Sequence, residues 1–331
     1  MPELDPSLLR RTPPAVLLMP GDAFDIDHCQ VMGRRVAGRS MARGFAAQLQ
    51  PGEVLSLITF SPEEKSSLRQ LMQPCLPPSA QLSFVPLDPE AIETVGALHV
   101  PDPGLSRWQL LRSGRSPSSF SLTGVIHTLS SSAVFQELER LWMSPIRPWD
   151  ALVCTSTAGR SVVQHVFDQV HDALQARFER SLPRPEGPQL PVIPLAVEDP
   201  FANSSISREQ QRRQARVELG ISDDAFVLLF LGRLSYHGKA HPLPLYRALQ
   251  QLVDHNPAAD IHLIECGHLF NDAIAEAYDD LLRHFPTLQL HRVGGLTPAT
   301  EVEKVRALAA ADVFVSLADN LQETFGLSVI E

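Results

Sequence analysis

Lysine is scarce in this chain of 331 residues: only Lys65, Lys239 and Lys304 occur, and the formal net charge is −10. A general nucleic-acid binder normally presents a basic face, so this charge argues against that class, although a local basic pocket for phosphates stays open. The four cysteines lie far apart and form no C-x-x-C pair. This spacing excludes an obvious zinc or disulfide framework.

Long apolar runs are also missing. The two longest, at 225–231 and 309–318, are interrupted or fall short of the roughly 20 residues that a membrane-spanning helix needs. The apolar stretch at 15–19 is too short for the core of a secretion signal. We therefore expect a cytoplasmic protein without a transmembrane segment, and leave peripheral membrane contact open. With 44% apolar and 20% charged residues, the composition is that of a folded chain long enough for two domains.

Short apolar, β-rich runs alternate with amphipathic stretches along the chain, which predicts βαβ units and parallel sheets covered on both faces. A polar segment at 199–206 divides the chain, so we expect one domain over 1–200 and a second over 201–331. In the first, strands are expected at 15–19, 54–60, 81–87, 122–127, 151–155 and 190–195, and helices at 33–49, 133–142 and 160–180. In the second, strands are expected at 225–231, 261–266, 288–293 and 313–317, and helices at 209–219, 243–253, 272–284 and 302–310.

A loop with two cations follows the strand expected at 225–231. It runs from Gly232 to Ala240 and differs from a phosphate-binding P-loop, because five residues separate its glycines and Ala240 has no hydroxyl for Mg²⁺. Arg233 and Lys239 nevertheless leave the carboxyl end of a parallel strand, where α/β folds bind ligands. A guanidinium and an ammonium together suit a diphosphate. The other interpretation is a solvated loop with two surface cations.

The small residues Thr324, Gly326 and Ser328 follow the strand expected at 313–317. They allow a helix to begin close to a ligand, where its first free N–H groups can hold an anion. Glu323 would stand just before this helix and Glu331 about two turns into it, positions that suit hydrogen bonds to sugar hydroxyls. An acidic helix cap with an ordinary surface glutamate is the alternative.

Taken together, these segments resemble the donor domain of retaining glycosyltransferases of the GT-B type, in the large family that contains sucrose synthases and bacterial mannosyltransferases (glycosyltransferase family 4). The family's signature is two glutamates separated by seven residues, and Glu323 and Glu331 have that spacing. Upstream, 122–129 resembles the family's strand with an active-site histidine, and 150–156 and 192–197 resemble its later N-domain strands. The resemblance implies an α/β fold of two facing, doubly wound Rossmann-like domains, with the acceptor on the N-terminal side and the nucleotide-sugar donor on the C-terminal side.

The resemblance also implies a role for each matched residue. Arg233 and Lys239 would bind the donor's diphosphate and stabilise its charge as the glycosidic bond breaks. Glu323 would contact the hydroxyls of the transferred sugar, and Glu331 would hold the ribose. Backbone N–H groups would assist at Phe325, Gly326 and Leu327.

His127, Gly33 and Gly294 complete the expected site. His127 would contact the donor sugar from the N-terminal domain, whereas a lone histidine at a strand end is otherwise a structural residue. Gly33, beside Arg34, would replace the paired glycines that many family members carry after the first strand. Gly294 lies in a loop that the resemblance places near the nucleotide base, where glycine allows close approach, or else it belongs to a plain turn. Neither the family nor the acidic segment at 22–28 demands a metal, and no cofactor is expected beside the donor.

The expected reaction keeps the donor's anomeric configuration, with the leaving phosphate acting as base, and its partners are a nucleotide-sugar donor and an unknown carbohydrate or other acceptor. A nucleotide-sugar epimerase or a phosphorylase on the same fold stays open. So does an inactive remnant or binding protein, because the chain ends at Glu331 inside an apolar run without a helix cap, which indicates truncation. A nicotinamide dehydrogenase is disfavoured, since no G-x-G-x-x-G follows an expected strand.

Overall fold

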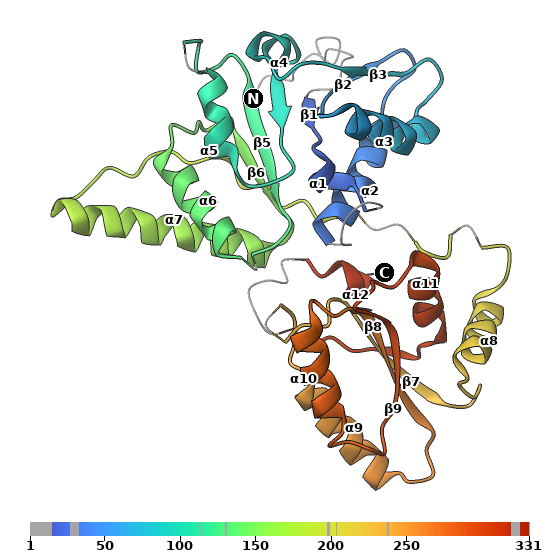
Figure 1. Cartoon of the computed structure of the whole chain (residues 1–331). Coiled ribbons are helices and arrows are strands. Elements are labelled where there is room, and N and C mark those ends of the chain that lie inside the picture. Colours follow the sequence, from blue (N-terminus) through green and yellow to red (C-terminus); the bar gives the residue numbers. More distant parts are fainter. Residues whose placement is uncertain are drawn as a thin grey trace, which may run out of the picture. The chain divides into compact units, whose positions relative to one another are not determined.

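The computed structural model describes residues 15–26, 33–112, 114–129, 131–196, 199–202, 204–236, 238–318 and 325–330. The chain divides into two compact units, 1–196 and 197–331 (Figure 1). Each unit has its own parallel sheet and its own apolar core.

Unit 1 is built on a six-stranded sheet with the order β3-β2-β1-β4-β5-β6, and its neighbouring strands are parallel. This is the order of a doubly wound sheet, in which the winding reverses between β1 and β4. The strands are β1 (Val16–Leu18), β2 (Val54–Ile58), β3 (Gln81–Phe84), β4 (Ala97–His99), β5 (Ser121–Ile126) and β6 (Ala151–Cys154).

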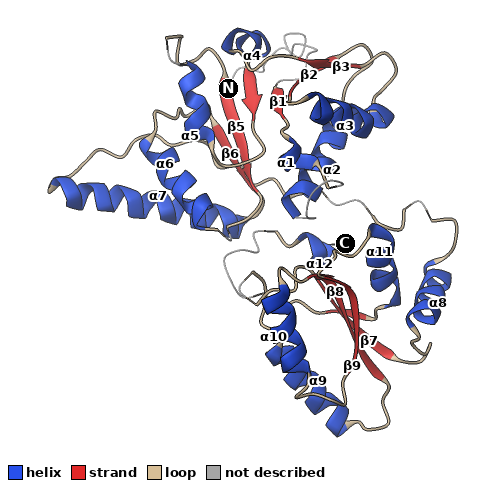
Figure 2. Cartoon of the chain, in the orientation of Figure 1, coloured by secondary structure: helices blue, strands red, loops and turns tan. Residues whose placement is uncertain are grey.

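Helices cover both faces of this sheet (Figure 2). Phe24 and Met72 pack with Leu57 on one face, and Leu141 packs with Leu152 on the other. The first face carries α1 (Gly21–Phe24), α2 (Gly33–Ala47) and α3 (Pro62–Met72); the second carries α4 (Pro89–Val95), α5 (Leu105–Trp108), α6 (Ser132–Met143) and α7 (Thr157–Phe178). Because helices cover both faces, the inner strand β1 is buried and apolar on both sides.

Unit 2 contains a four-stranded parallel sheet with the order β10-β7-β8-β9. Its strands are β7 (Phe226–Leu231), β8 (Ile261–His268), β9 (Gln289–Gly295) and β10 (Val313–Phe314). Helices α8 (Arg208–Leu219) and α11 (Glu301–Ala310) pack on one face, and α9 (Leu243–His255) and α10 (Asp272–Leu282) pack on the other. The short helix α12 (Leu327–Ile330) follows.

An arginine–aspartate pair stabilises each unit; the pair of unit 1 is buried, and in the pair of unit 2 the arginine is buried and the aspartate is partly exposed. In unit 1, Asp150 is fully buried and accepts two hydrogen bonds from Arg112, at 2.7 and 2.9 Å, besides the N–H of Leu122 at 2.7 Å. In unit 2, Asp312 accepts from Arg216 at 2.7 Å and from the N–H of Val227 at 2.8 Å. Both carboxylates therefore join a helix or loop to a central strand.

Residues 190–195 do not form the strand that the sequence predicted. Only isolated bridges occur there, from Gln189 to Ala151 and from Val192 to Cys154. Pro191 and Pro194 explain the difference, because proline has no N–H to donate to a strand ladder. The strand that the sequence missed is β4, whose three residues are too few to show a periodic pattern. Among the helices that the structure describes, none is long and apolar enough to cross a membrane.

Candidate functional site

The loop after β7 leaves the sheet of unit 2 where the winding reverses. β7 lies between β8, the next strand in the chain, and β10, the last strand of this sheet. The direction in which the sheet is wound therefore changes beside β7. In open α/β sheets, ligands bind outside the strand ends at such a point. Arg233 and Lys239 both lie in this loop, shortly after the last residue of β7.

Three glycines pack against one another at the ends of β7, β8 and β9. A Cβ on Gly267 would stand 1.7 Å from the carbonyl oxygen of Gly232, and a Cβ on Gly294 would stand 2.3 Å from the carbonyl oxygen of Gly267. Neither position has room for a side chain, and Gly294 also has a φ of 91°, which favours glycine. The strand ends therefore present backbone rather than side chains.

Beyond Gly232 the loop runs beside β8 and then turns back. The N–H of Leu234 donates to the carbonyl of His268 at 2.9 Å, and the N–H of Lys239 donates to the carbonyl of Ser235 at 2.8 Å. This turn brings the Lys239 side chain close to the glycines. If Gly232 carried a Cβ, that atom would lie 3.8 Å from the Cε of Lys239. The ammonium is thus held beside the strand ends.

Arg233 and Lys239 form a cationic pair. Both are partly buried, and the guanidinium carbon of Arg233 lies 3.7 Å from the place of a Cβ on Gly238, next to Lys239 in the chain. Burial, and then repulsion by Arg233, lowers the pKa of Lys239 to about 8. An anion placed against both cations would relieve this repulsion and replace part of the lost hydration.

In unit 1, His127 stands at the end of β5, next to the point between β1 and β4 where that sheet reverses its winding. Burial, and then the charge of Arg34 on α2, lowers the pKa of His127 to about 4, although a hydrogen bond to the backbone of Pro101 opposes the shift. At neutral pH His127 is therefore an uncharged imidazole, suited to hydrogen bonding with a hydroxyl.

Asp22 on α1 forms ion pairs with Arg34 and Arg35 of α2. The two helices touch through their backbones, because a Cβ on Gly38 would stand 2.0 Å from the carbonyl oxygen of Ala23. These contacts fix Arg34 near His127. Within the part of the chain that the structure describes, no group of three or more acidic, histidine or cysteine side chains could hold a metal.

His99, the last residue of β4, is a second histidine at this edge, and the sequence did not single it out. Its side chain is 8% exposed, with Nδ1 2.9 Å from the Thr123 hydroxyl. Its Nε2 is buried without a hydrogen-bond partner among the described residues. Burial, and then His127, lowers the pKa of His99 to about 4. A histidine that ends a short apolar run was the available signal, but the run was too short to be recognised as a strand.

The structure brings Arg233, Lys239 and Gly294 together in unit 2. Gly33 is the exposed first residue of α2 in unit 1, and the role expected for it stays a prediction. The sequence analysis did not single out Gly267, which the close packing of the three glycines requires. The feature that could have indicated it is a glycine at the end of a buried strand. Phe325 and Gly326 immediately precede α12, which begins at Leu327, whereas Glu323 and Glu331 lie outside the described residues.

Solved structures share this fold. HepE of Anabaena, in complex with UDP and glucose, is 12% identical over 96% of this chain and 77% of its own, with a TM-score of 0.59. The N-terminal domain of trehalose-6-phosphate phosphatase from Candida albicans is 14% identical over 93% of this chain and 80% of its own, with a TM-score of 0.54. The catalytic domain of starch synthase IV from Arabidopsis thaliana, bound to ADP and acarbose, is 11% identical over 92% of this chain and 78% of its own, with a TM-score of 0.50.

The fold is of the GT-B type. It consists of Rossmann-like α/β units with parallel sheets, as the sequence predicted. At identities this low, the likeness establishes the fold alone. No protein-family model matches the chain, and no curated protein matches it.

Proposed function

We propose that this chain transfers a sugar from a nucleotide diphosphate sugar to an acceptor with retention of configuration, and that unit 2 binds the donor. The observation that carries the proposal is the cationic pair of Arg233 and Lys239 beside the glycine-lined ends of β7, β8 and β9. Two cationic side chains beside strand ends that carry no side chains suit a diphosphate, because its oxygens accept hydrogen bonds from both cations. The fold supports the proposal, since HepE with the same fold was solved with UDP.

In this mechanism the cations act on the leaving group. As the glycosidic bond breaks, negative charge grows on the diphosphate, and Arg233 and Lys239 stabilise it in a partly dehydrated loop. His127 is neutral at physiological pH and, by resemblance, forms a hydrogen bond with a hydroxyl of the donor sugar. By resemblance, Glu323 contacts the sugar and Glu331 the ribose. The acceptor oxygen bonds to the anomeric carbon on the face from which the diphosphate departs, and the leaving phosphate takes the acceptor's proton. The product therefore keeps the donor's configuration.

Binding of UDP tests the donor site directly. We expect Lys239→Ala to weaken UDP binding by about tenfold or more in calorimetric titration, because a charge-assisted hydrogen bond is worth about 1.5–3 kcal/mol. Lys65→Ala is the matched control: Lys65 is exposed on α3 in the other unit, above the ring of Phe84. Equal affinity of the Lys239→Ala variant and the parent would contradict the proposed site.

Transfer is tested with UDP-, GDP- and ADP-sugars and a panel of acceptors. Nucleotide release that depends on the acceptor separates a transferase from an epimerase, and proton NMR of the product reads its anomeric configuration. An inverted product would disprove retention. Tight nucleotide binding without any transfer would favour the binding-protein alternative.

A further inference from the structure

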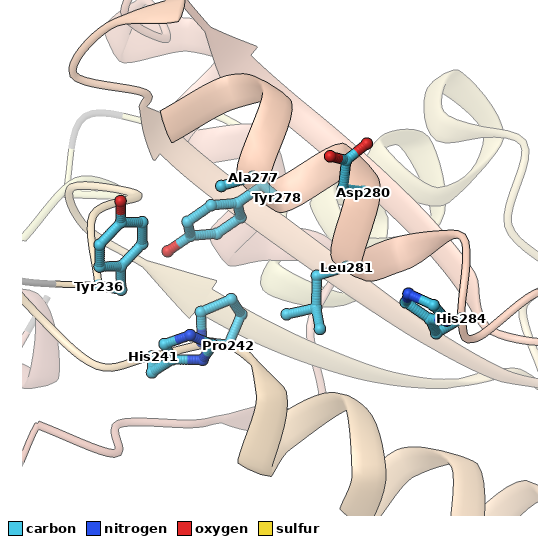
Figure 3. Close-up of a pocket in the computed structure, with 8 residues that line it drawn as sticks. All are labelled: Tyr236, His241, Pro242, Ala277, Tyr278, Asp280, Leu281 and His284. Carbon is cyan, nitrogen blue, oxygen red and sulfur yellow. The ribbon is translucent and has the colours of Figure 1, made fainter. Parts of the chain in front are cut away.

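A pocket of about 380 Å³ opens on unit 2 between α10 and the segment that leads into α9 (Figure 3). Its volume lies within the range of about 300–1,000 Å³ that is typical of small-molecule sites. The lining residues are Tyr236, His241, Pro242, Ala277, Tyr278, Asp280, Leu281 and His284. Aromatic and apolar groups thus alternate with a few polar ones.

Tyr278 forms a fixed wall of the pocket. Its side chain is 2% exposed and belongs to a buried cluster with Leu234, Leu269 and Ile274. The guanidinium carbon of Arg292 lies 6.0 Å from the Tyr278 ring centroid. Because the ring is packed from several sides, a ligand would meet it without the cost of ordering it.

Arg292 is itself held by a network that runs from the buried Glu265 to the exposed Asp279. It donates to Glu265 at 3.3 Å and to Asp279 at 2.5 Å, and the other oxygen of Glu265 accepts from the Tyr246 hydroxyl at 2.5 Å. Burial raises the pKa of Glu265, while Tyr246 and Arg292 lower it. Glu265, on β8, therefore links α9 and β9.

The rim is more accessible and carries the polar groups. Tyr236 is 42% exposed, and its ring centroid lies 5.7 Å from that of His241 at an interplanar angle of 38°. Figure 3 shows the Tyr278 hydroxyl directed toward Tyr236. Asp280 is exposed on α10 and pairs only with Arg283 one turn further along among the described side chains. Such a surface pair contributes little stability, so this carboxylate can accept from a ligand instead.

We propose that this pocket binds a saccharide, at a site that adjoins the proposed nucleotide-sugar site through Tyr236, which lies in the loop of Arg233 and Lys239. A sugar ring offers an apolar C–H face to Tyr236 or His241, and hydroxyls to the Asp280 carboxylate and the His284 imidazole. Phosphorylated ligands fit poorly, because none of the eight lining residues is a lysine or arginine and Asp280 would repel them. The site does not depend on the proposed transferase activity.

The chain has three tyrosines, Tyr236, Tyr246 and Tyr278, which makes labelled tyrosine a selective probe. We would label the rings with ¹³C in the full chain, assign them with single Tyr→Phe variants, and titrate maltotriose and cellotriose. With at least one of them, the signals of Tyr236 and Tyr278 should move with saturation, and that of the buried Tyr246 should not.

Asp280→Asn should weaken this binding by about tenfold, because it removes a charged acceptor. Glu276→Gln is the matched control, since Glu276 is exposed on the same helix and does not line the pocket. No shift with either saccharide, equal shifts of all three tyrosines, or unchanged affinity in Asp280→Asn would overturn the proposal. Shifts induced by choline but by neither saccharide would overturn it in favour of a cation site. Saccharide binding without UDP binding would instead count against the donor site alone.

Discussion

Lys239 has an ammonium that titrates close to physiological pH, because burial and Arg233 both disfavour its charge. A diphosphate favours the charged form, so UDP affinity should be highest below about pH 8 and fall as the lysine loses its proton. The phosphate of the ligand has its own transition near pH 6, well below this range. Between pH 7.5 and 9.5 we expect the dissociation constant to rise by about tenfold, measured by calorimetric titration.

Lys239→Arg provides the control for this pH dependence. Arginine remains protonated throughout the range, so the variant should bind UDP with an affinity that changes little between pH 7.5 and 9.5. If the variant and the parent lose affinity in parallel, a group other than Lys239 is titrating.

His99 and His127 make the stability of unit 1 sensitive to acid. Burial lowers the pKa of both to about 4, whereas a histidine in the unfolded chain titrates near 6.5. Between these values the unfolded state binds more protons, so stability is complete above about pH 6.5 and decreases as the pH falls toward 4. For one histidine the full difference is on the order of 3 kcal/mol.

Urea unfolding at pH 7 and pH 4.5 measures this loss. A His99→Gln variant should show a smaller difference between the two pH values than the parent, because it lacks one of the two titrating groups. His165→Gln serves as the matched control, because this histidine is exposed on α7. Equal pH dependence in all three proteins would show that the buried histidines do not determine the acid sensitivity.

At the scale of elements, the close approach of β7 and β8 requires Gly267. A Cβ there would stand 1.7 Å from a backbone oxygen of Gly232, and backbone cannot rotate away as a side chain can. Gly267→Ala should therefore reduce the free energy of unfolding by about 3 kcal/mol or more, the upper range for overpacking, and should also weaken UDP binding.

Gly44→Ala is the opposite control. Gly44 lies inside α2, and nothing would stand within 4 Å of its Cβ. Alanine should stabilise this helix by up to about 1 kcal/mol, because it forms helix more readily than glycine. Denaturant unfolding compares the two variants, and a Gly267→Ala protein as stable as the parent would disprove the steric argument.

The sequence predicts elements well where burial on both faces imposes a long pattern. The runs at 225–231 and 261–266 correspond to β7 and β8, since a covered parallel strand must be apolar throughout. The prediction fails at β4, which is short, and at 190–195, where two prolines interrupt an apolar run. In both cases tertiary packing, rather than local pattern, decides the outcome.

The site follows the same division. Arg233 and Lys239 are predicted from sequence because charged residues after a buried strand are conspicuous, and the structure places both in the loop after β7. His99 and Gly267 are not, because their importance arises from neighbours far along the chain: Thr123 beside His99, and the carbonyl of Gly232 beside Gly267. Long-range packing of this kind leaves no local spacing to recognise.

At the scale of the whole molecule, each unit has its own core and its own arginine–aspartate pair, and the pair of unit 1 is buried. Removing the charge of Asp150 leaves Arg112 buried without its partner, since the carboxylate is fully buried and Arg112 nearly so. Asp150→Asn should therefore cost about 3–5 kcal/mol. Asp168→Asn is the control in the same unit, because Asp168 and Arg184 form an exposed pair worth at most about 1 kcal/mol.

Hydrogen exchange followed by mass spectrometry locates the effect. In Asp150→Asn, amides of β5 and β6 should exchange faster than in the parent, because Asp150 also accepts a hydrogen bond from the N–H of Leu122 at the start of β5. Amides of β7 and β8 should keep their protection, since their side chains belong to the separate clusters of unit 2. Loss of protection in both sheets to the same extent would mean that the two cores unfold as one cooperative block, and that a stability defect in unit 1 also disrupts the loop of Arg233 and Lys239 in unit 2.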